Sequence, residues 1–198
     1  MTRLLIWRHG QTAWNALRQT QGQLDIDLNE VGVEQASVGA ALLAARRPDL
    51  IVSSDLSRCA STARPLSLLC GLPVVFDKRL RERDFGPWQG LLPGEIHERW
   101  PQEYEHWQRT EESVVPGIES IEDLAVRAAA AFADAAEQVG DGTAVLVTHG
   151  GAAKAGAARL LGWPVHVGHA LKVLDNCHWT ELRRTSFGWQ LFAHNVGS

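Results

Sequence analysis

Hydrophobic residues in this chain form short uninterrupted runs that alternate with longer segments of helical periodicity. The runs span only three or four residues, as in strands that are buried on both faces. They are residues 4–7, 50–52, 74–76 and 144–147. The helical segments repeat apolar positions at a spacing of three to four residues and are rich in alanine towards the C-terminus. They are residues 33–47, 121–139 and 150–161.

This alternation predicts the α/β class, with a mainly parallel sheet covered by helices on both faces in a three-layer αβα sandwich. Residues 177–182 and 189–193 predict closing strands, including an antiparallel edge strand. Asn29 is placed to cap the helix over residues 33–47, and Ser120 with Asp123 approximates a capping box before residue 121. The run Ser53-Ser54-Asp55 offers further caps, for a helix that carries Arg58 in its first turn.

The least regular part of the chain is residues 93–118, which contain Trp100, Tyr104, Trp107 and several prolines. Such a segment predicts a partly helical flap over the active site rather than a second domain. No repeat or linker divides the sequence, so residues 1–198 are predicted to form a single domain.

Composition narrows the function classes. The chain has 19 Lys and Arg against 23 Asp and Glu, and the net charge of −4 excludes a globally basic nucleic-acid binder. No stretch approaches the roughly 20 apolar residues of a membrane span, and residues 4–7 are too short for a signal-peptide core. The three cysteines have no metal-ligand spacing. We therefore expect a cytoplasmic protein without nucleic-acid or membrane partners.

Cationic and imidazole side chains follow three of the predicted strands. Arg8 and His9 follow the first, Arg58 follows the second, and His149 follows the run 144–147. The carboxyl ends of parallel strands meet at one edge of the sheet, so these residues are expected to converge in space. Clustered positive charges cost free energy unless an anion lies between them. The sequence therefore predicts a phosphate pocket.

Three other site types were compared with the sequence, and none is supported as well as the phosphate pocket. Cys177 and Arg183 have the Cys-x5-Arg spacing of cysteine-dependent phosphatases, but the residues between them include no glycine to curl around a phosphate. No GxxxxGK[S/T] loop is present. The run HVGH at residues 166–169 lacks the spacing and the glutamate of a zinc protease and is predicted to lie in a loop.

A set of short motifs then runs in a recognisable order along most of the chain. They are Arg8-His9-Gly10-Gln11-Thr12, Gln21-Gly22, Ser54-Asp55-Leu56 with Arg58, Leu80-Arg81-Glu82 with Trp88-Gln89-Gly90, and Thr148-His149-Gly150-Gly151. In this set the sequence resembles the histidine phosphatase superfamily, which has the phosphoglycerate mutase-like fold.

The resemblance implies a mechanism. His9 would be the nucleophile that forms a phosphohistidine, and Glu82 would protonate the leaving alkoxide, with Asp84 as the rival acid. Six further residues would surround the substrate and its phosphate: Arg8, Asn15, Gln21, Gly22, Arg58 and His149. The resemblance implies no metal and no other cofactor, because the cationic side chains supply the positive field.

Several substrates stay open. Mutases of the superfamily carry a lysine where this chain has Pro93 and an Arg-Arg pair where it has Gln108-Arg109, so hydrolysis is favoured over a cofactor-dependent phosphoglycerate mutase. The runs QGQLD and IVSSDL resemble glucosyl-3-phosphoglycerate phosphatases, while α-ribazole and broad-specificity phosphatases share much of the pattern. We expect a small phosphorylated substrate, glucosyl-3-phosphoglycerate or similar. A phosphoprotein substrate and a homodimer remain alternatives.

Overall fold

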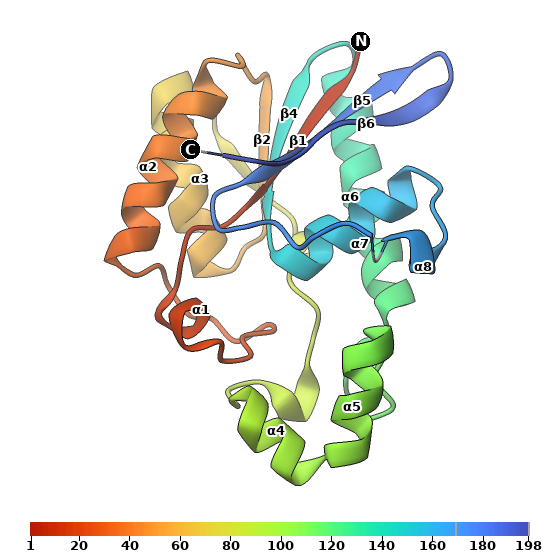
Figure 1. The fold of residues 1–198 in the computed structure, drawn as a ribbon. Helices are drawn as coiled ribbons and strands as arrows, with labels where there is room; N and C mark the ends of the chain where they lie inside the picture. Colours follow the sequence, from red (N-terminus) through yellow and green to blue (C-terminus); the bar gives the residue numbers. More distant parts are fainter. Residues whose placement is uncertain (169, 198) are drawn as a thin grey trace.

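A six-stranded sheet in the order β3-β2-β4-β1-β5-β6 forms the centre of the computed structural model, which describes residues 1–168 and 170–197 (Figure 1). The strands β3, β2, β4 and β1 run parallel, β5 is antiparallel to β1, and β6 is antiparallel to β5. The strands are β1 (Arg3–Arg8), β2 (Leu50–Ser53), β3 (Val74–Phe76), β4 (Thr143–Thr148), β5 (Trp179–Thr185) and β6 (Gly188–Val196). The predicted fold class is confirmed, and its antiparallel part is a two-stranded hairpin.

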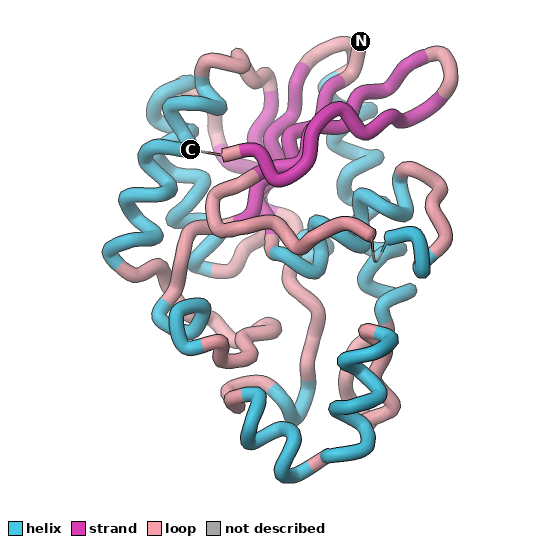
Figure 2. Tube along the Cα trace, viewed as in Figure 1, coloured by secondary structure: helices cyan, strands magenta, loops and turns pink. Residues whose placement is uncertain are grey.

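Helices cover both faces of this sheet (Figure 2). Side chains alternate along β1, so Leu5 and Trp7 pack with α2 (Glu30–Ala44) and α3 (Ser57–Cys70). Leu4 and Ile6 pack on the opposite face with α6 (Ile121–Val139) and α7 (Gly150–Leu160). Burial on both faces explains why the strand sequences are apolar without interruption.

The start of α3 differs from the prediction. This helix begins at Ser57 behind Leu56, and no side chain of residues 53–55 caps it. The Ser54 hydroxyl instead lies 2.9 Å from Nε2 of His149, and the Asp55 carboxylate pairs with Arg81 at 2.6 Å. Ser54 and Asp55, which the local sequence predicts as helix caps, therefore bond to residues that are distant in the sequence.

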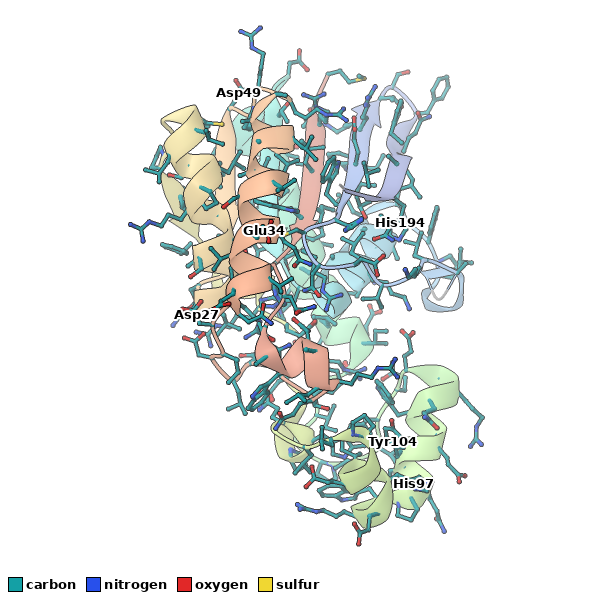
Figure 3. All side chains as sticks on the ribbon, turned by 60° about the vertical axis from the view of Figure 1, so that its left-hand side comes forward. Asp27, Glu34, Asp49, His97, Tyr104 and His194 are labelled. Carbon is teal, nitrogen blue, oxygen red and sulfur yellow. The ribbon has the colours of Figure 1, made fainter. Side chains whose placement is uncertain are left out.

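Residues 93–118 lie beyond the carboxyl ends of the parallel strands and carry α4 (Pro93–Arg99) and α5 (Pro101–Thr110). They pack through an apolar cluster of their own, which includes Trp88, Ile96 and Val115. In Figure 3, Tyr104 of this segment lies at the opposite end of the molecule from Asp49, which directly precedes β2. The 93–118 segment is therefore on the side of the sheet where the predicted site residues end their strands.

The remaining elements are short. They are α1 (Ala13–Leu17), the 3-10 turns Lys78–Leu80 and Gly86–Trp88, and α8 (Val165–Gly168). The helix α8 corrects the predicted loop over residues 166–168, whereas residue 169 lies outside the described residues. Among the helices that the structure describes, none combines the length and apolar character that crossing a bilayer requires.

Candidate active site

All eight predicted site residues line a single cavity of ≈ 240 Å³. They are Arg8, His9, Asn15, Gln21, Gly22, Arg58, Glu82 and His149. His9 directly follows β1, His149 directly follows β4, and Arg58 lies in the first turn of α3 after β2. The parallel sheet therefore brings together side chains that are up to 141 positions apart in the sequence, as the strand pattern predicts.

The imidazole of His9 is almost fully buried, with 3% of the residue exposed. Its Nδ1 lies 2.7 Å from the carbonyl oxygen of Gly10. Because a carbonyl oxygen can only accept, Nδ1 carries the hydrogen, and the lone pair of the neutral ring is on Nε2. Burial, together with the nearby charges of Arg58 and Arg8, lowers the pKa of His9 well below its usual value. The ring is therefore neutral at pH 7, the form in which Nε2 can act as a nucleophile.

The guanidinium of Arg58 has no exposed surface and is fixed by three donated hydrogen bonds. They run to Nδ1 of His149 at 3.2 Å, to the Leu24 carbonyl at 2.8 Å and to the Gly22 carbonyl at 2.7 Å. Gly22 has φ +52°, and a Cβ there would lie 2.1 Å from Oε1 of Gln89. A side chain at this position would be strained by the positive φ and would displace Gln89, and the turn holds Arg58 in place.

Arg8 is held differently. One of its terminal nitrogens donates to the Leu174 carbonyl at 2.5 Å, while its buried Nε has no hydrogen-bond partner among the described residues. Within residues 1–168 and 170–197, neither Arg8 nor Arg58 forms an ion pair with a carboxylate. Two cations beside His9 thus have no carboxylate within ion-pair distance among the described residues, an arrangement typical of a phosphate site.

Asn15 also lines this cavity. Its Oδ1 already accepts from the backbone N–H of Thr12 at 3.1 Å and from Nδ2 of Asn176 at 3.3 Å. The side chain of Asn176 also donates to the His9 carbonyl at 3.0 Å. Asn176 is a positioning residue that sequence reasoning missed, because nothing local marks it and its partners lie 161 and 167 positions away.

His149 is fully buried, and both of its ring nitrogens have protein partners. Arg58 donates to Nδ1, so the hydrogen of the neutral ring is on Nε2, which donates to the Ser54 hydroxyl at 2.9 Å. Burial, with the charge of Arg58, lowers the pKa of His149 well below its usual value. Ser54 thus fixes the orientation of this ring, a role the sequence did not reveal because the residue was interpreted as a helix cap.

The Glu82 carboxylate accepts three backbone hydrogen bonds. They come from Arg83 at 2.8 Å, Gly151 at 3.0 Å and Ala152 at 3.1 Å, and the last two belong to the N-terminus of α7. A Cβ on Gly151 would lie 2.5 Å from Oε1 of Glu82, so a glycine is needed there. Asp84, the rival acid, accepts from the backbone of Gly86 at 2.8 Å and does not line the cavity.

Aromatic side chains form the wall of the cavity towards the 93–118 segment. Trp107 stacks on Tyr104 with ring centroids 5.7 Å apart and meets Trp88 edge to face at 5.8 Å. Phe85 and Trp107, together with Glu82, also line a second cavity of ≈ 600 Å³. These three side chains therefore lie where the small cationic cavity and the larger one adjoin.

The cysteine alternative has no support in the geometry. Burial raises the pKa of Cys177 to about 12, and Arg183 is paired with Glu181 at 2.6 Å on β5. A thiolate nucleophile needs a lowered pKa and a free cation beside it. Neither condition is met.

This fold, with two histidines, two unpaired arginines and a carboxylate in one cavity, defines a histidine phosphatase. The family model described as the histidine phosphatase superfamily (branch 1) matches residues 4–197, and the chain belongs to this superfamily. It is a phosphoric monoester hydrolase, as predicted.

Three similar proteins refine this assignment. Glucosyl-3-phosphoglycerate phosphatase of Mycolicibacterium vanbaalenii is 41% identical over 187 residues, covering 91% of this chain and 83% of that protein. The solved structure of a mycobacterial glucosyl-3-phosphoglycerate phosphatase in complex with VO3 has a TM-score of 0.92 at 40% identity, over 98% and 99% of the two chains. The probable phosphoglycerate mutase GpmB of Yersinia pestis is 35% identical over 194 residues, covering 96% and 88%.

Proposed function

We propose that this protein is a metal-independent phosphomonoesterase that works through a phosphohistidine on a small phosphorylated metabolite. The observation that carries the proposal is the setting of His9. Its Nδ1 hydrogen is fixed on the Gly10 carbonyl, its pKa is lowered, and it lies between Arg8 and Arg58, which have no carboxylate partner among the described residues.

In the first step, Nε2 of His9 attacks phosphorus, a P–N bond forms, and the P–O bond to the alcohol breaks. Glu82 transfers its proton to the departing alkoxide oxygen. In the second step, Glu82 takes a proton from water, the water oxygen attacks phosphorus, and the P–N bond breaks. The products are the alcohol, inorganic phosphate and His9 in its original state.

The donors around the phosphate stabilise the charge on its oxygens in both steps. Arg8 offers its unpartnered Nε, Arg58 its guanidinium and Asn15 its amide. His149 lines the same cavity and contributes through Arg58, whose Nε–H it accepts at Nδ1. Gln21, whose buried Oε1 has no partner among the described residues, and Gly22 complete the rim.

Glucosyl-3-phosphoglycerate or a similar metabolite is the proposed substrate. The identity of 41% to a phosphatase of that name supports it, as does the likeness to the VO3 complex. A mutase would return the phosphoryl group to the alcohol, and Pro93 lines the cavity where mutases of the superfamily place a lysine. The aromatic 93–118 segment acts as the flap that excludes bulky phosphoproteins.

The test compares wild-type protein with His9→Ala, each with and without EDTA. Wild-type protein is expected to hydrolyse p-nitrophenyl phosphate and glucosyl-3-phosphoglycerate equally well in EDTA, and acid-labile phosphate should accumulate on His9. Asp84→Asn is the matched control for Glu82→Gln, and only the latter should slow turnover of the glucosyl substrate. Full activity of His9→Ala, loss of activity in EDTA, or rapid interconversion of 3- and 2-phosphoglycerate would contradict the proposal.

A cytoplasmic location and a homodimer belong to the same proposal. Edge strand β3 exposes Val75 and Phe76, and the end of the preceding helix exposes Leu68 and Leu69. Apolar side chains at an unpaired strand edge favour pairing with a second copy. Light scattering after size exclusion should give twice the chain mass for wild-type protein and the monomer mass for Phe76→Arg. A wild-type monomer would refute the dimer.

A further inference from the structure

We propose that the larger cavity beyond Glu82 receives the leaving alcohol and that Lys154 binds a carboxylate on that alcohol. The inference rests on the proposed phosphatase function and adds to it a specificity-determining residue, Lys154, for the acid group of the alcohol.

The position of the cavity follows from the reaction. Attack by His9 is in line, so the bond to the leaving oxygen breaks on the side of phosphorus opposite His9. The acid that protonates this oxygen must lie on the same side. Glu82, the proposed acid, lines both the cationic cavity and the larger one. The rest of the alcohol therefore extends past Glu82 into the larger cavity, alongside the edge-to-face pair of Phe85 and Trp107 that lines both cavities.

The size and walls of this cavity suit a small organic group. Its volume of ≈ 600 Å³ falls within the range of small-molecule sites. It is lined largely by apolar side chains that α6 and α7 contribute, including Ile121, Leu124 and Ala155. Trp107 and Trp163 add aromatic faces, on which the apolar face of a sugar ring can pack.

Lys154 is a buried cation in the wall of this cavity. It lies on α7 three positions after Gly151, so both residues share one face of the helix, and the Gly151 N–H holds Glu82. Only 8% of Lys154 is exposed, although lysine is a residue rarely buried without a functional or structural reason. Its ammonium lies 2.6 Å from Oε1 of Glu111.

The other two cations in the wall are less suited. Arg83 is already engaged, since it donates to the carbonyls of Glu119 and Glu111 and pairs with Glu112 at 3.5 Å. Arg159 is half-exposed and pairs with Glu122 at 2.6 Å. An ammonium has three N–H groups, so Lys154 can donate to Glu111 and to a substrate carboxylate together.

A purely structural role for Lys154 makes a different prediction. Glu111 caps the C-terminus of α5, so its pair with Lys154 also ties the flap to α7. If that were its only role, removing either partner would slow all substrates alike. If Lys154 recognises the substrate, only its own removal lowers the preference for carboxylated substrates.

The experiment therefore uses two substrates that differ in a single group. 3-Phosphoglycerate carries a carboxylate where glycerol 3-phosphate carries a hydroxymethyl group. The readout is the ratio of their kcat/KM values in wild-type protein, Lys154→Met, Lys154→Arg, Glu111→Gln and Arg159→Met. Charge-assisted hydrogen bonds predict that Lys154→Met lowers this ratio about 10- to 100-fold, mainly through KM for 3-phosphoglycerate.

Lys154→Arg, which retains the charge, should restore most of the ratio, and Glu111→Gln and Arg159→Met should keep it near the wild-type value. An unchanged ratio in Lys154→Met would overturn the proposal, as would equal losses of ratio in Lys154→Met and Glu111→Gln. Failure of the phosphatase proposal itself would look different: wild-type protein would hydrolyse neither substrate, or His9→Ala would remain active on both.

Discussion

The Nε–H of Arg58 donates to Nδ1 of His149 across 3.2 Å, although the two residues are 91 positions apart. Because arginine can only donate, this contact places the hydrogen of the neutral imidazole on Nε2, where Ser54 accepts it. The same contact holds the plane of the guanidinium, whose two terminal nitrogens donate to the carbonyls of Gly22 and Leu24. This one hydrogen bond thus fixes both the tautomer of His149 and the orientation of the Arg58 guanidinium.

Replacement of Arg58 by lysine should therefore be poorly tolerated. A single ammonium cannot make the three divergent bonds to His149, Gly22 and Leu24, and it offers no planar fork to a phosphate. We expect Arg58→Lys to lower kcat/KM for p-nitrophenyl phosphate by about 10²- to 10³-fold in steady-state assays. Arg64→Lys, an exposed change on the same helix, is the control and should behave as wild type. Equal activity of the two variants would show that catalysis does not depend on the three hydrogen bonds that Arg58 donates.

Gly151→Ala should act on Glu82 through sterics alone. The added methyl group would lie 2.5 Å from Oε1 of Glu82 and displace the carboxylate from the N-terminus of α7. Hydrolysis of an alkyl phosphate should slow by about 10²-fold or more, because its alkoxide needs a proton. p-Nitrophenyl phosphate should be affected less, because p-nitrophenolate leaves without a proton.

The control for this prediction is Gly94→Ala in α4, where an added Cβ meets no atom within 4 Å. Its kinetic constants should match those of wild-type protein on both substrates. An equal loss on both substrates in Gly151→Ala would mean that the change disturbs the phosphate pocket rather than the acid.

Acidification should destabilise the protein through His9 and His149. Their pKa values in the folded protein are lowered well below the usual value, chiefly by burial, whereas in the unfolded chain both titrate near 6.5. Below about pH 6.5 the unfolded state therefore binds more protons, and the free energy of unfolding falls as the pH falls. Each histidine contributes up to about 1.4 kcal/mol per pH unit until its folded-state pKa is reached.

Urea unfolding of wild-type protein and of the double variant His9→Asn/His149→Asn at about pH 6.5 and about pH 5.5 tests this. The wild-type protein should lose about 2 kcal/mol more than the double variant over that unit, since each histidine contributes about 1 kcal/mol between its half-protonated and nearly fully protonated unfolded state. The buffer must be free of phosphate, because a ligand that binds only the native state would stabilise it. Equal losses would mean that the histidines are not neutral in the folded protein.

Phe132 is expected to dominate the packing between α6 and α7. It is fully buried, and a Cβ on Gly156 of α7 would lie only 2.6 Å from its ring. We expect Phe132→Ala to lower the free energy of unfolding by about 3 to 5 kcal/mol in urea titrations. Phe187→Ala removes the same atoms from a side chain that is 91% exposed and should change it by less than about 0.5 kcal/mol. Similar values for the two variants would contradict this view of the core.

The sequence predicted the strands and most helices well, because periodicity and capping are local properties. The helix over residues 121–139 has the predicted ends, with Ser120 capping through the backbone N–H of Asp123. The predicted caps at residues 53–55 were wrong, because Ser54 and Asp55 bond to His149 and Arg81 instead. A short polar run is consistent with either use, and only the distant partners decide between them.

Some residues of the candidate site could be predicted from the sequence, and others could not. His9 and Arg58 could be selected from the sequence because their residue types suit phosphate binding and each follows a predicted strand. Glu82 was identified through the resemblance to the superfamily. Their supporting contacts could not be selected. Asn176 and the Leu174 carbonyl lie more than 150 positions from the residues that they hold, and no local pattern marks them.

The sequence by itself determined the α/β class, the superfamily and the residues that gather around the phosphate. Strand ends and motifs can be identified from short runs of neighbouring residues, and the order of the motifs follows from their positions along the chain. The tertiary structure alone decided the state of those residues. It placed the His9 hydrogen on Nδ1, removed solvent from both histidines, and opened a second cavity behind Glu82 with Lys154 in its wall. Protonation and recognition of the alcohol depend on burial and on partners distant in sequence, and these arise only when the chain is folded.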